Sequence, residues 1–319
     1  MNAKKLNSLF LSAVALIPVL WGRVSALEVV MPGYVARTYV SYSCPAEREP
    51  RGITFDYYGN LYLSNWDKYP NIGSIYRVSR DKSVSRWVDG IGTPRAMVWG
   101  SGTDYGDYLY VPDATPCDLL KVSPEGAVST VCHIGAGPHS LELDSTGAYG
   151  GYMYVATRNP DQVYYVSESG ELHLFADFPG SVSGGHSDLA FDAGDYYGGL
   201  MYAALEYGSG HAGSYGLYTI DPQGNAEKFA PALISACDVE IDPYGLFGGW
   251  MFVTGVSDVN ESYYSMWRVH PDGGVEEFAV GTIGTRQLLS FTFALDGAMY
   301  VPEYSVEDQT MVVTRIVPR

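Results

Sequence analysis

The sequence has few cysteines, four in 319 residues, which excludes a small scaffold held together by disulfides. Its hydrophobic content of 46%, with 17% charged residues, is enough to build a large interior instead. Cys117 and Cys132 flank two short β runs around a Pro-Glu-Gly turn, so we expect a cross-strand disulfide between them. For Cys44 and Cys237 the sequence leaves both a disulfide and two thiols open.

Basic residues are also scarce. The chain has 19 Lys and Arg against 36 Asp and Glu, a formal net charge of −17 at pH 7. Binding of nucleic acid or of anionic lipid requires clustered Lys and Arg, so this composition excludes both kinds of partner. An acidic surface suits cations or neutral substrates; the alternative is that it only keeps the protein in solution.

Long apolar runs are absent after the first residues. Near the N-terminus, Lys4 and Lys5 precede the apolar run LFLSAVALIPVLW, and the small residues of VSA follow it. This order is typical of a secretory signal peptide covering residues 1–26, and the run is too short to span a bilayer. We therefore expect a secreted or periplasmic protein without membrane insertion, with residues 27–319 as a single domain.

After residue 26 no segment has the 3.6-residue period of an amphipathic helix; the chain instead repeats one β-rich unit. Six segments share a pattern visible in FDYYGNLYLS, LDSTGAYGGYMYVA and IDPYGLFGGWMFVT. Their aromatic anchors recur every 44 to 50 residues, at Tyr62, Tyr110, Tyr154, Tyr202, Phe252 and Tyr300. Each unit holds four short runs separated by Gly, Pro, Asp and Ser. This repeat predicts an all-β fold, a six-bladed β-propeller with four-stranded blades.

The two ends of the chain predict how the ring closes. The last unit stops after its third strand, MVVTRIVP, and the segment VVMPGYVARTYVSY resembles the missing turn and outer strand. An N-terminal strand that completes the C-terminal blade would close the ring and remove its sheet edges. Stretches such as DSTGAYGG and DAGDYYGG predict turns capped by Asp side chains, with a calcium site as the alternative.

Histidine is scarce as well, with six in the chain, yet two occur at the start of the inner strand in consecutive units, in GPHSLELD and GGHSDLAFD. In a propeller, the starts of the inner strands and the ends of the second strands face the same mouth of the central channel. The inner-strand starts are expected to bring together Arg51, Arg95, His139, His186 and Cys237. The fourth unit has one extra residue at this point, which predicts a bulge.

The ends of the second strands add polar side chains to this mouth: Asn65, Asp113, Arg158, Glu206, Asp258 and Glu303. Acids, bases, cations and metal-ligand types thus converge in one concave place, the usual pattern of an active site. The alternative is a polar ring that only satisfies strand ends and water.

The blade signature, Pro-x-Gly-Ile followed by Asp-x-x-Gly-x-Leu-Tyr-Val and Ile-Tyr-Arg-Val, resembles the NHL repeat and the streptogramin B lyase-like propellers along nearly all of residues 27–319. In that lyase family two inner-strand histidines and a second-strand glutamate surround a magnesium ion. The resemblance implies the same roles for His139 in PHSL, His186 in GHSD and Glu206 in MYAALE.

The sequence is also similar to the peptidyl-amidoglycolate lyases, which are secreted six-bladed propellers with a zinc ion held by channel histidines. By that resemblance the third ligand would be Glu206, Cys237 or His211. The metal-binding residues expected from both resemblances are His139, His186, Glu206 and Cys237, and the cofactor is a divalent metal ion (Mg, Ca or Zn).

These residues predict an exported, metal-assisted lyase that acts on a small or medium organic molecule in the funnel. The ion would polarise a carbonyl or carboxylate, and His139 or His186 would take a proton as general base. Glu206 would orient the imidazole or ligate the ion, while Arg51 and Arg95 would offset developing negative charge.

Two other functions stay open at this point. The first is a non-catalytic binding or accessory propeller that uses the 27 tyrosines to hold a carbohydrate, a peptide or an aromatic metabolite. The second is a phosphotriesterase or lactonase of the six-bladed class, which matches less well because its Glu and Asn calcium cage is not evident.

Overall fold

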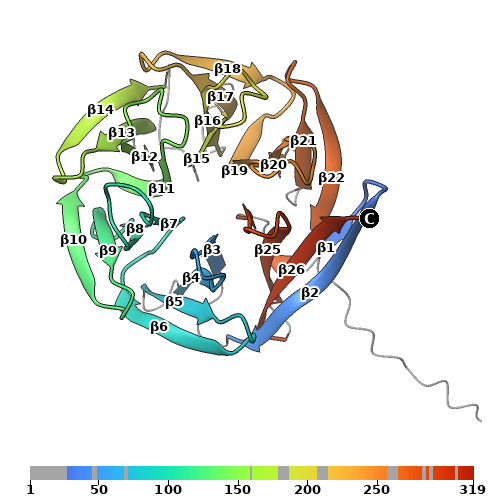
Figure 1. The fold of residues 1–319 in the computed structure, drawn as a ribbon, viewed down its shortest axis with the longest axis horizontal. Coiled ribbons are helices and arrows are strands. Elements are labelled where there is room, and N and C mark those ends of the chain that lie inside the picture. The colour runs from blue at the N-terminus through green and yellow to red at the C-terminus, as the bar shows by residue number, and fades with distance from the viewer. Residues whose placement is uncertain are drawn as a thin grey trace, which may run out of the picture.

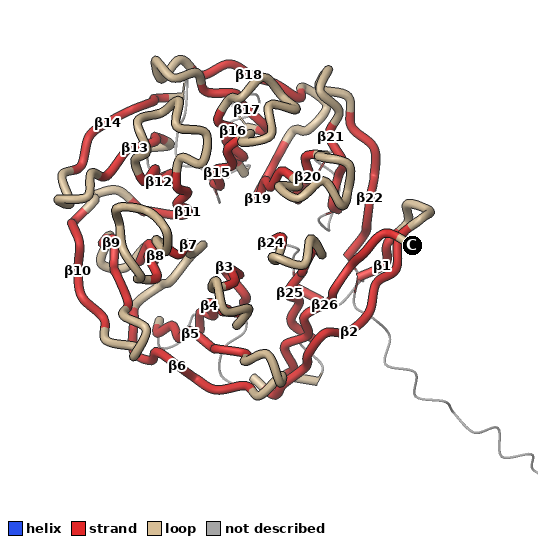
Figure 2. Tube along the Cα trace, in the orientation of Figure 1, coloured by secondary structure: helices blue, strands red, loops and turns tan. Residues whose placement is uncertain are grey.

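The computed structural model describes residues 27–44, 49–67, 71–158, 160–178, 187–206, 215–256, 265–281, 285–286, 290–305 and 308–319. The predicted signal peptide, residues 1–26, lies outside them. Every regular element of the described residues is a β-strand, and no helix among them could cross a membrane. The strands form six sheets around a central axis (Figure 1, Figure 2). The prediction of an all-β, six-bladed propeller is confirmed.

Four consecutive antiparallel strands form each of the first four blades, numbered in chain order from the axis outward. Blade 1 contains β3 (Glu49–Phe55), β4 (Leu61–Asp67), β5 (Ile72–Val78) and β6 (Val84–Ile91). Blade 2 contains β7 (Val98–Trp99), β8 (Leu109–Asp113), β9 (Asp118–Val122) and β10 (Val128–His133). Blade 3 contains β11 (Gly137–Leu143), β12 (Met153–Arg158), β13 (Gln162–Val166) and β14 (Leu172–Asp177). Blade 4 contains β15 (Ser187–Phe191), β16 (Met201–Leu205), β17 (Gly216–Ile220) and β18 (Ala226–Ala230).

The last two blades each gain a strand from the N-terminal segment. Blade 5 contains β19 (Ser235–Ile241), β20 (Met251–Val256), β21 (Ser265–Val269) and β22 (Val275–Gly281), with β1 (Leu27–Val29) outside β22. Blade 6 contains β23 (Thr285–Arg286), β24 (Thr292–Phe293), β25 (Met299–Ser305) and β26 (Thr310–Pro318), with β2 (Tyr34–Ser43) outside β26.

The pairing of β2 with β26 closes the ring, as the sequence predicts. The two strands are antiparallel from Tyr34↔Pro318 to Ser43↔Thr310, with one irregularity between Thr38 and Val40. The short β1, which the repeat pattern does not predict, pairs with β22 of the neighbouring blade. Figure 1 shows β1 and β2 side by side on the outside of blades 5 and 6. The N-terminal segment therefore joins these two blades as well as completing the last one.

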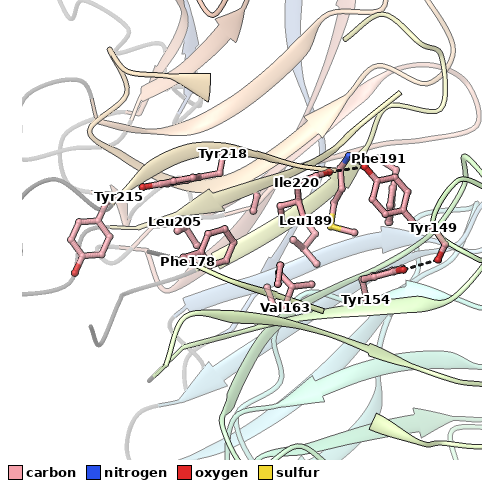
Figure 3. Packing of buried hydrophobic residues seen from close by; sticks show 14 residues of the cluster. Tyr149, Tyr154, Val163, Phe178, Leu189, Phe191, Leu205, Tyr215, Tyr218 and Ile220 are labelled. Carbon is pink, nitrogen blue, oxygen red and sulfur yellow. Dashed lines mark hydrogen bonds between the residues drawn. The ribbon is translucent and has the colours of Figure 1, made fainter. Parts of the chain in front are cut away.

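The hydrophobic core is divided among the six junctions between neighbouring blades. Each of the six buried clusters takes its residues from two adjacent sheets. At the junction of blades 3 and 4, for example, Val163 and Tyr154 pack with Leu189, Phe191 and Ile220 (Figure 3). Because the alternating apolar residues of a blade face one neighbour on each side, no blade can bury its faces alone.

A buried tyrosine links consecutive blades by hydrogen bonds at three junctions. Tyr149, in the loop between β11 and β12, donates its hydroxyl proton to the carbonyl of Ile220 in blade 4 (2.6 Å) and accepts from the backbone N–H of Met201 (2.8 Å). Tyr154 holds this loop by donating to the carbonyl of Tyr149 (2.6 Å; Figure 3). At the Met201–Ile220 pair the hydroxyl therefore bridges β16 and β17 and binds both strands to the preceding blade.

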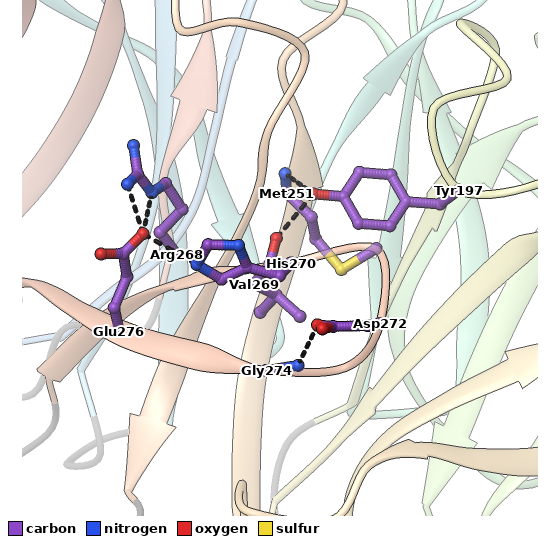
Figure 4. Close-up of polar contacts among 8 residues, drawn as sticks. All are labelled: Tyr197, Met251, Arg268, Val269, His270, Asp272, Gly274 and Glu276. Carbon is purple, nitrogen blue, oxygen red and sulfur yellow. Dashed lines mark hydrogen bonds and ion pairs between the residues drawn. The ribbon is translucent and has the colours of Figure 1, made fainter.

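The same arrangement recurs on both sides of that junction. Tyr105 bonds to Val166 and Met153 of blade 3, and Tyr197 bonds to Val269 and Met251 of blade 5 (Figure 4). The next loop has Phe247 at this position, which packs against Tyr34 and Phe293 without a hydroxyl.

The Asp-containing turns are held by the carboxylates themselves. Asp144 accepts backbone N–H bonds from Thr146, Gly147, Tyr149 and Gly151 at 2.9 to 3.0 Å. Burial alone would raise the pKa of Asp144, but these bonds and the Thr146 hydroxyl hold it below its ordinary value. Both carboxylate oxygens are thus engaged by the turn. The structure supports the turn interpretation of DSTGAYGG over a calcium site.

The expected disulfide between Cys117 and Cys132 does not form; none of the four cysteines, all of them described, is in a disulfide. Cys117 lies in the turn before β9 with a φ of +76°, and the strand register places Cys132 opposite Leu119. The register shift between Thr130 and Cys132 moves Cys132 one further residue from Cys117, which regular pairing would also not place opposite it.

Removal of residues 27–42 tests the ring closure. Without β2, blade 6 loses its outer strand and exposes the edge of β26, so we expect a truncated protein that aggregates and lacks a cooperative thermal transition. Size-exclusion chromatography and calorimetry of the truncated and parent proteins measure this. A soluble truncated protein with a cooperative transition would contradict the closure.

Substitution Tyr149→Phe tests the hydrogen bonds between blades 3 and 4. It removes the hydroxyl and leaves the buried groups of Ile220 and Met201 unsatisfied, so the free energy of unfolding should fall by about 1–3 kcal/mol. The control is Tyr152→Phe in the same loop, where the tyrosine is 38% exposed. Urea titration should show a change within about 0.5 kcal/mol for this control. Equal losses in the two variants would contradict a linking role for the Tyr149 hydroxyl.

Candidate active site

A small cavity on the axis is lined by residues from all six blades. Its volume is about 30 Å³, the space of a single water molecule. The lining residues come from the starts of the inner strands: Arg51, Ala96, His139, Ser187, Asp188, Cys237, Asp238 and Ser290. The structure thus brings together three residues that the sequence predicts for this place, Arg51, His139 and Cys237.

These three residues share a backbone feature. The pairing of the inner strand with its neighbour shifts between Pro50 and Gly52, between Pro138 and Ser140, and between Ala236 and Asp238. Arg51, His139 and Cys237 are the extra residues of these bulges, and a bulge redirects a side chain out of the regular alternation. This explains how residues at the inner edge of three different sheets line one axial cavity.

Blade 4 does not show the predicted bulge within its described residues. Strand β15 pairs with β16 in regular register from Ser187↔Leu205 to Phe191↔Met201. Ser187, which is 4% exposed, lines the cavity in this blade. His186 and His211 lie outside the described residues, so their roles stay predictions.

Two arginines lie against one tryptophan beside the cavity. The guanidinium carbons of Arg51 and Arg95 are 5.0 and 6.0 Å from the centre of the Trp66 ring. The electrons of the ring face attract both positive charges in a cation–π interaction. Arg95 is buried, and only its neighbour Ala96 lines the axial cavity. The structure therefore brings the two predicted arginines together, with Arg51 nearer the axis.

Asp188 and Asp238 form a carboxyl pair between blades 4 and 5. Asp188 Oδ2 accepts from the backbone N–H of Val239 (3.1 Å), and Asp238 Oδ2 accepts from the N–H of Phe291 (2.6 Å). Each side chain therefore reaches the inner strand or inner segment of the following blade. The two carboxyls are also hydrogen-bonded to each other.

The two carboxyls do not ionise independently of each other. Burial, the charge of Asp188 and the bond to Asp188 hold the pKa of Asp238 well above its usual range. Burial also raises the pKa of Asp188, although the hydrogen bonds from Asp238 and from Val239 oppose the rise. Asp238 therefore keeps its proton to a higher pH than Asp188 does, because two adjacent carboxyls do not readily ionise together.

Two glutamates continue this acidic lining further along the inner strands. Burial and the charge of Asp188 raise the pKa of Glu142 to about 8. Burial, Glu142 and Asp188 raise the pKa of Glu240 well above its ordinary value. Sequence analysis did not select any of these four carboxyls. The signal was an acid inside an otherwise apolar inner strand, in SLELD, SDLAFD and CDVEID.

None of the described residues predicted at the ends of the second strands lines the axial cavity, and Asp258 lies outside the described residues. Glu206 follows β16 and is buried, but it is not among the residues that line the cavity. Glu303 on β25 is 0% exposed, and neither of its carboxyl oxygens has a hydrogen-bond partner among the described residues. Burial raises the pKa of Glu303 to about 8.

The remaining described histidines lie on outer parts of the blades. His133 contacts Asp118 (2.8 Å), and His270 contacts Glu276 (2.9 Å; Figure 4). The His173 ring stacks on Tyr165 at 4.7 Å between ring centres. Each has a structural contact there, so His139 is the described histidine that belongs to the axial cavity.

No protein-family model and no curated protein matches the chain. Among solved structures, virginiamycin B lyase from Staphylococcus aureus matches with a TM-score of 0.55 at 9% identity, over 90% of this chain and 100% of that one. A gluconolactonase from Xanthomonas campestris matches with a TM-score of 0.56 at 13% identity, over 87% and 98%. The calcium-binding protein regucalcin from Agrobacterium tumefaciens matches with a TM-score of 0.59 at 11% identity, over 90% and 96%.

At these identities the match shows a shared fold. The chain has the six-bladed fold of these lyase, lactonase and calcium-binding propellers, which confirms the resemblance found in the sequence at the level of the fold.

The described residues do not fit a divalent metal ion. Among them, no three His, Cys, Asp or Glu side chains are grouped so that they could hold one. His139 and Cys237 line the axial cavity but Glu206 does not. The predicted metal set depends on His186, which lies outside the described residues, so it stays a prediction.

Substitution Glu303→Gln tests the buried carboxyl. The pKa of Glu303 is about 8 in the folded chain, against an ordinary value of 4.5 in the unfolded chain. The contribution of Glu303 to the free energy of unfolding is thus fully present below about pH 4.5 and is lost as the pH rises toward about 8. Because Gln does not ionise, the variant should be more stable than the parent above about pH 8, by about 2–4 kcal/mol.

The measurement is urea unfolding of both proteins between about pH 5 and about pH 8.5. The control is Glu125→Gln, in the exposed turn between β9 and β10, which should leave the pH dependence unchanged. A parent and a Glu303→Gln variant with the same pH dependence would show that Glu303 ionises normally.

Proposed function

We propose that this propeller is an enzyme that carries out acid–base chemistry, of the lyase type, on a small organic molecule at the mouth of the channel. The observation that carries the proposal is the axial cavity, where a pair of interacting carboxyls, an imidazole and a guanidinium meet. Its fold neighbours include a lyase and a lactonase, which supports a propeller enzyme. Perturbed carboxyls in a concave site also favour function over a structural ring.

The cavity volume limits what part of a substrate can enter. About 30 Å³ accommodates one small group, such as a carbonyl or carboxylate oxygen, and the rest of the molecule stays at the mouth. Arg51 is the cation that would hold this oxygen and stabilise the charge that develops on it. This arrangement favours a substrate with a proton next to a carbonyl or carboxylate.

The chain's own residues supply both proton transfers. His139 would take the proton from the carbon atom as general base, and the electrons of that C–H bond would form the new double bond. The bond from the adjacent carbon to its leaving oxygen or nitrogen would break as Asp238 donates its proton to that atom. Asp188 and Asp238 would then both be ionised, so the proton on His139 returns to the pair and restores the starting state.

Asp238→Asn tests this assignment. Asparagine keeps the size of the side chain but carries no acidic proton, so turnover should fall by about 10²-fold or more. Parent and variant are compared on a panel of cyclic esters, uronides and amidated peptides, with circular dichroism to confirm folding. In the parent, kcat/KM should decline as the pH rises and Asp238 ionises, above the range of an ordinary Asp, and the variant should lose that decline.

The control is Asp195→Asn, on the exposed loop between β15 and β16, where asparagine tolerates the left-handed φ of +55°. Its turnover should match the parent. An Asp238→Asn variant with full turnover would overturn the proposed role. A parent that binds members of the panel without converting any of them would support the non-catalytic binding alternative.

A further inference from the structure

Two adjacent tyrosines project from the face of the propeller opposite the axial cavity. Tyr57 and Tyr58, in the turn between β3 and β4, are 76% and 67% exposed. Their ring centres are 6.0 Å apart with an angle of 80° between the planes. Arg51 lies near the start of β3 and these tyrosines follow its end, so the two features lie at opposite ends of one strand.

The turn that carries the tyrosines is fixed by its own hydrogen bonds. Asp56 accepts from the backbone N–H of Asn60 (2.8 Å), from the Asn60 side-chain amide (2.7 Å) and from the Tyr62 hydroxyl (3.1 Å). Gly59 takes a φ of +81° that completes the turn. A ligand that binds the tyrosines would therefore order only their side chains, which lowers the entropic cost of binding.

Tyr57 and Tyr58 both line three pockets on this face. A pocket of about 720 Å³ lies toward the turn between β5 and β6, with Asn60, Ser79, Arg80, Asp81 and Ser83. One of about 440 Å³ extends to blade 6, and its walls include Tyr39, Tyr300, Asp296 and Arg315. One of about 210 Å³ extends to blade 2, and its walls include Trp99, Arg77 and Asp107. The tyrosines are thus the centre of a groove across three blades.

The charged groups of this groove are nearly balanced, unlike those of the chain as a whole. Three arginines and four aspartates line the pockets: Arg77, Arg80, Arg315, Asp56, Asp81, Asp107 and Asp296. Arg315 and Asp296 form an ion pair at 2.8 Å, and Asp81 is held in its own turn by hydrogen bonds from Ser79 and from the N–H of Ser83. Arg80 is exposed and has no hydrogen-bond or ion-pair partner in the described part of the chain.

We propose that the groove around Tyr57 and Tyr58 binds a neutral oligosaccharide. The C–H face of a sugar ring packs on an exposed tyrosine, and its hydroxyls both donate and accept hydrogen bonds. Such hydroxyls join the paired Arg and Asp groups without displacing a charge, and Arg80 supplies a further donor. A strongly charged ligand would have to compete with the Arg315–Asp296 pair, and a polyanion would also be repelled by a chain with a net charge of −17. This site is independent of the proposed activity on the opposite face.

The test is binding of defined neutral oligosaccharides to the protein spanning residues 27–319. Glucan, mannan and N-acetylglucosamine chains of about two to six units are measured by calorimetry, next to oligogalacturonate and a proline-rich peptide. Because Trp99 lines one of the pockets, its fluorescence gives a second readout. We expect at least one neutral chain to bind, with Tyr57→Ala and Tyr58→Ala each weakening it about fivefold and the double variant more than tenfold.

The matched control is Tyr244→Ala, an exposed tyrosine in the equivalent loop of blade 5 (49% exposed). It should bind as the parent does, and thermal melting should show that all variants fold. The proposal is overturned if no neutral chain binds at millimolar concentration, if the double variant binds as the parent does, or if only the acidic chain or the peptide binds. It is also overturned if sedimentation shows a dimer that Tyr57→Ala dissociates, since the tyrosines would then contact a second copy.

Discussion

The antiparallel pairing of β2 with β26 is the contact on which the rest of the structure depends. Each blade buries its two faces only against its neighbours, so a ring that is open at one junction loses a core cluster there. The axial cavity takes side chains from all six blades, and their relative positions are defined only in a closed ring. The hydroxyls of Tyr105, Tyr149 and Tyr197 donate hydrogen bonds to the following blade at three consecutive junctions and so fix how these blades sit against each other. Closure and these hydrogen bonds together place Asp188 within reach of Asp238.

Most of the fold follows from the repeat. The aromatic anchors recur because Tyr62, Tyr154 and Tyr202 each fill a junction between blades, and a residue with that role must recur once in every unit. The three residues of β1 have no counterpart in the repeat, so nothing in their sequence indicates a strand. The role of Tyr149 was equally hidden, because its hydroxyl bonds to residues more than 50 positions away, Ile220 and Met201. Such contacts follow from how blades pack, not from the pattern within one unit.

The candidate site could be predicted only in part from the sequence. Arg51, His139 and Cys237 were found because equivalent positions in a repeat end at equivalent places around the axis. Asp188 and Asp238 were not found, because their importance comes from one another. Within its own strand each is an isolated acid. Only the packing of β15 against β19 brings the two carboxyls close enough for each to affect the ionisation of the other. The same holds for Glu303, where burial raises the pKa and no local pattern indicates the burial.

The two ends of β3 show how one short strand serves both faces of the ring. At one end the bulge at Arg51 directs a cation toward the axis, and at the other end Asp56 fixes the turn with Tyr57 and Tyr58. The axial cavity has a volume of about 30 Å³, which is too small to hold a sugar ring. Glu142 and Glu240 add carboxyls further along the inner strands, where burial favours their protonated forms. The pockets at the tyrosines share no lining residue with the axial cavity, so a molecule held there would not contact its residues. The axial cavity and the tyrosine groove therefore lie at opposite ends of β3, a strand of seven residues.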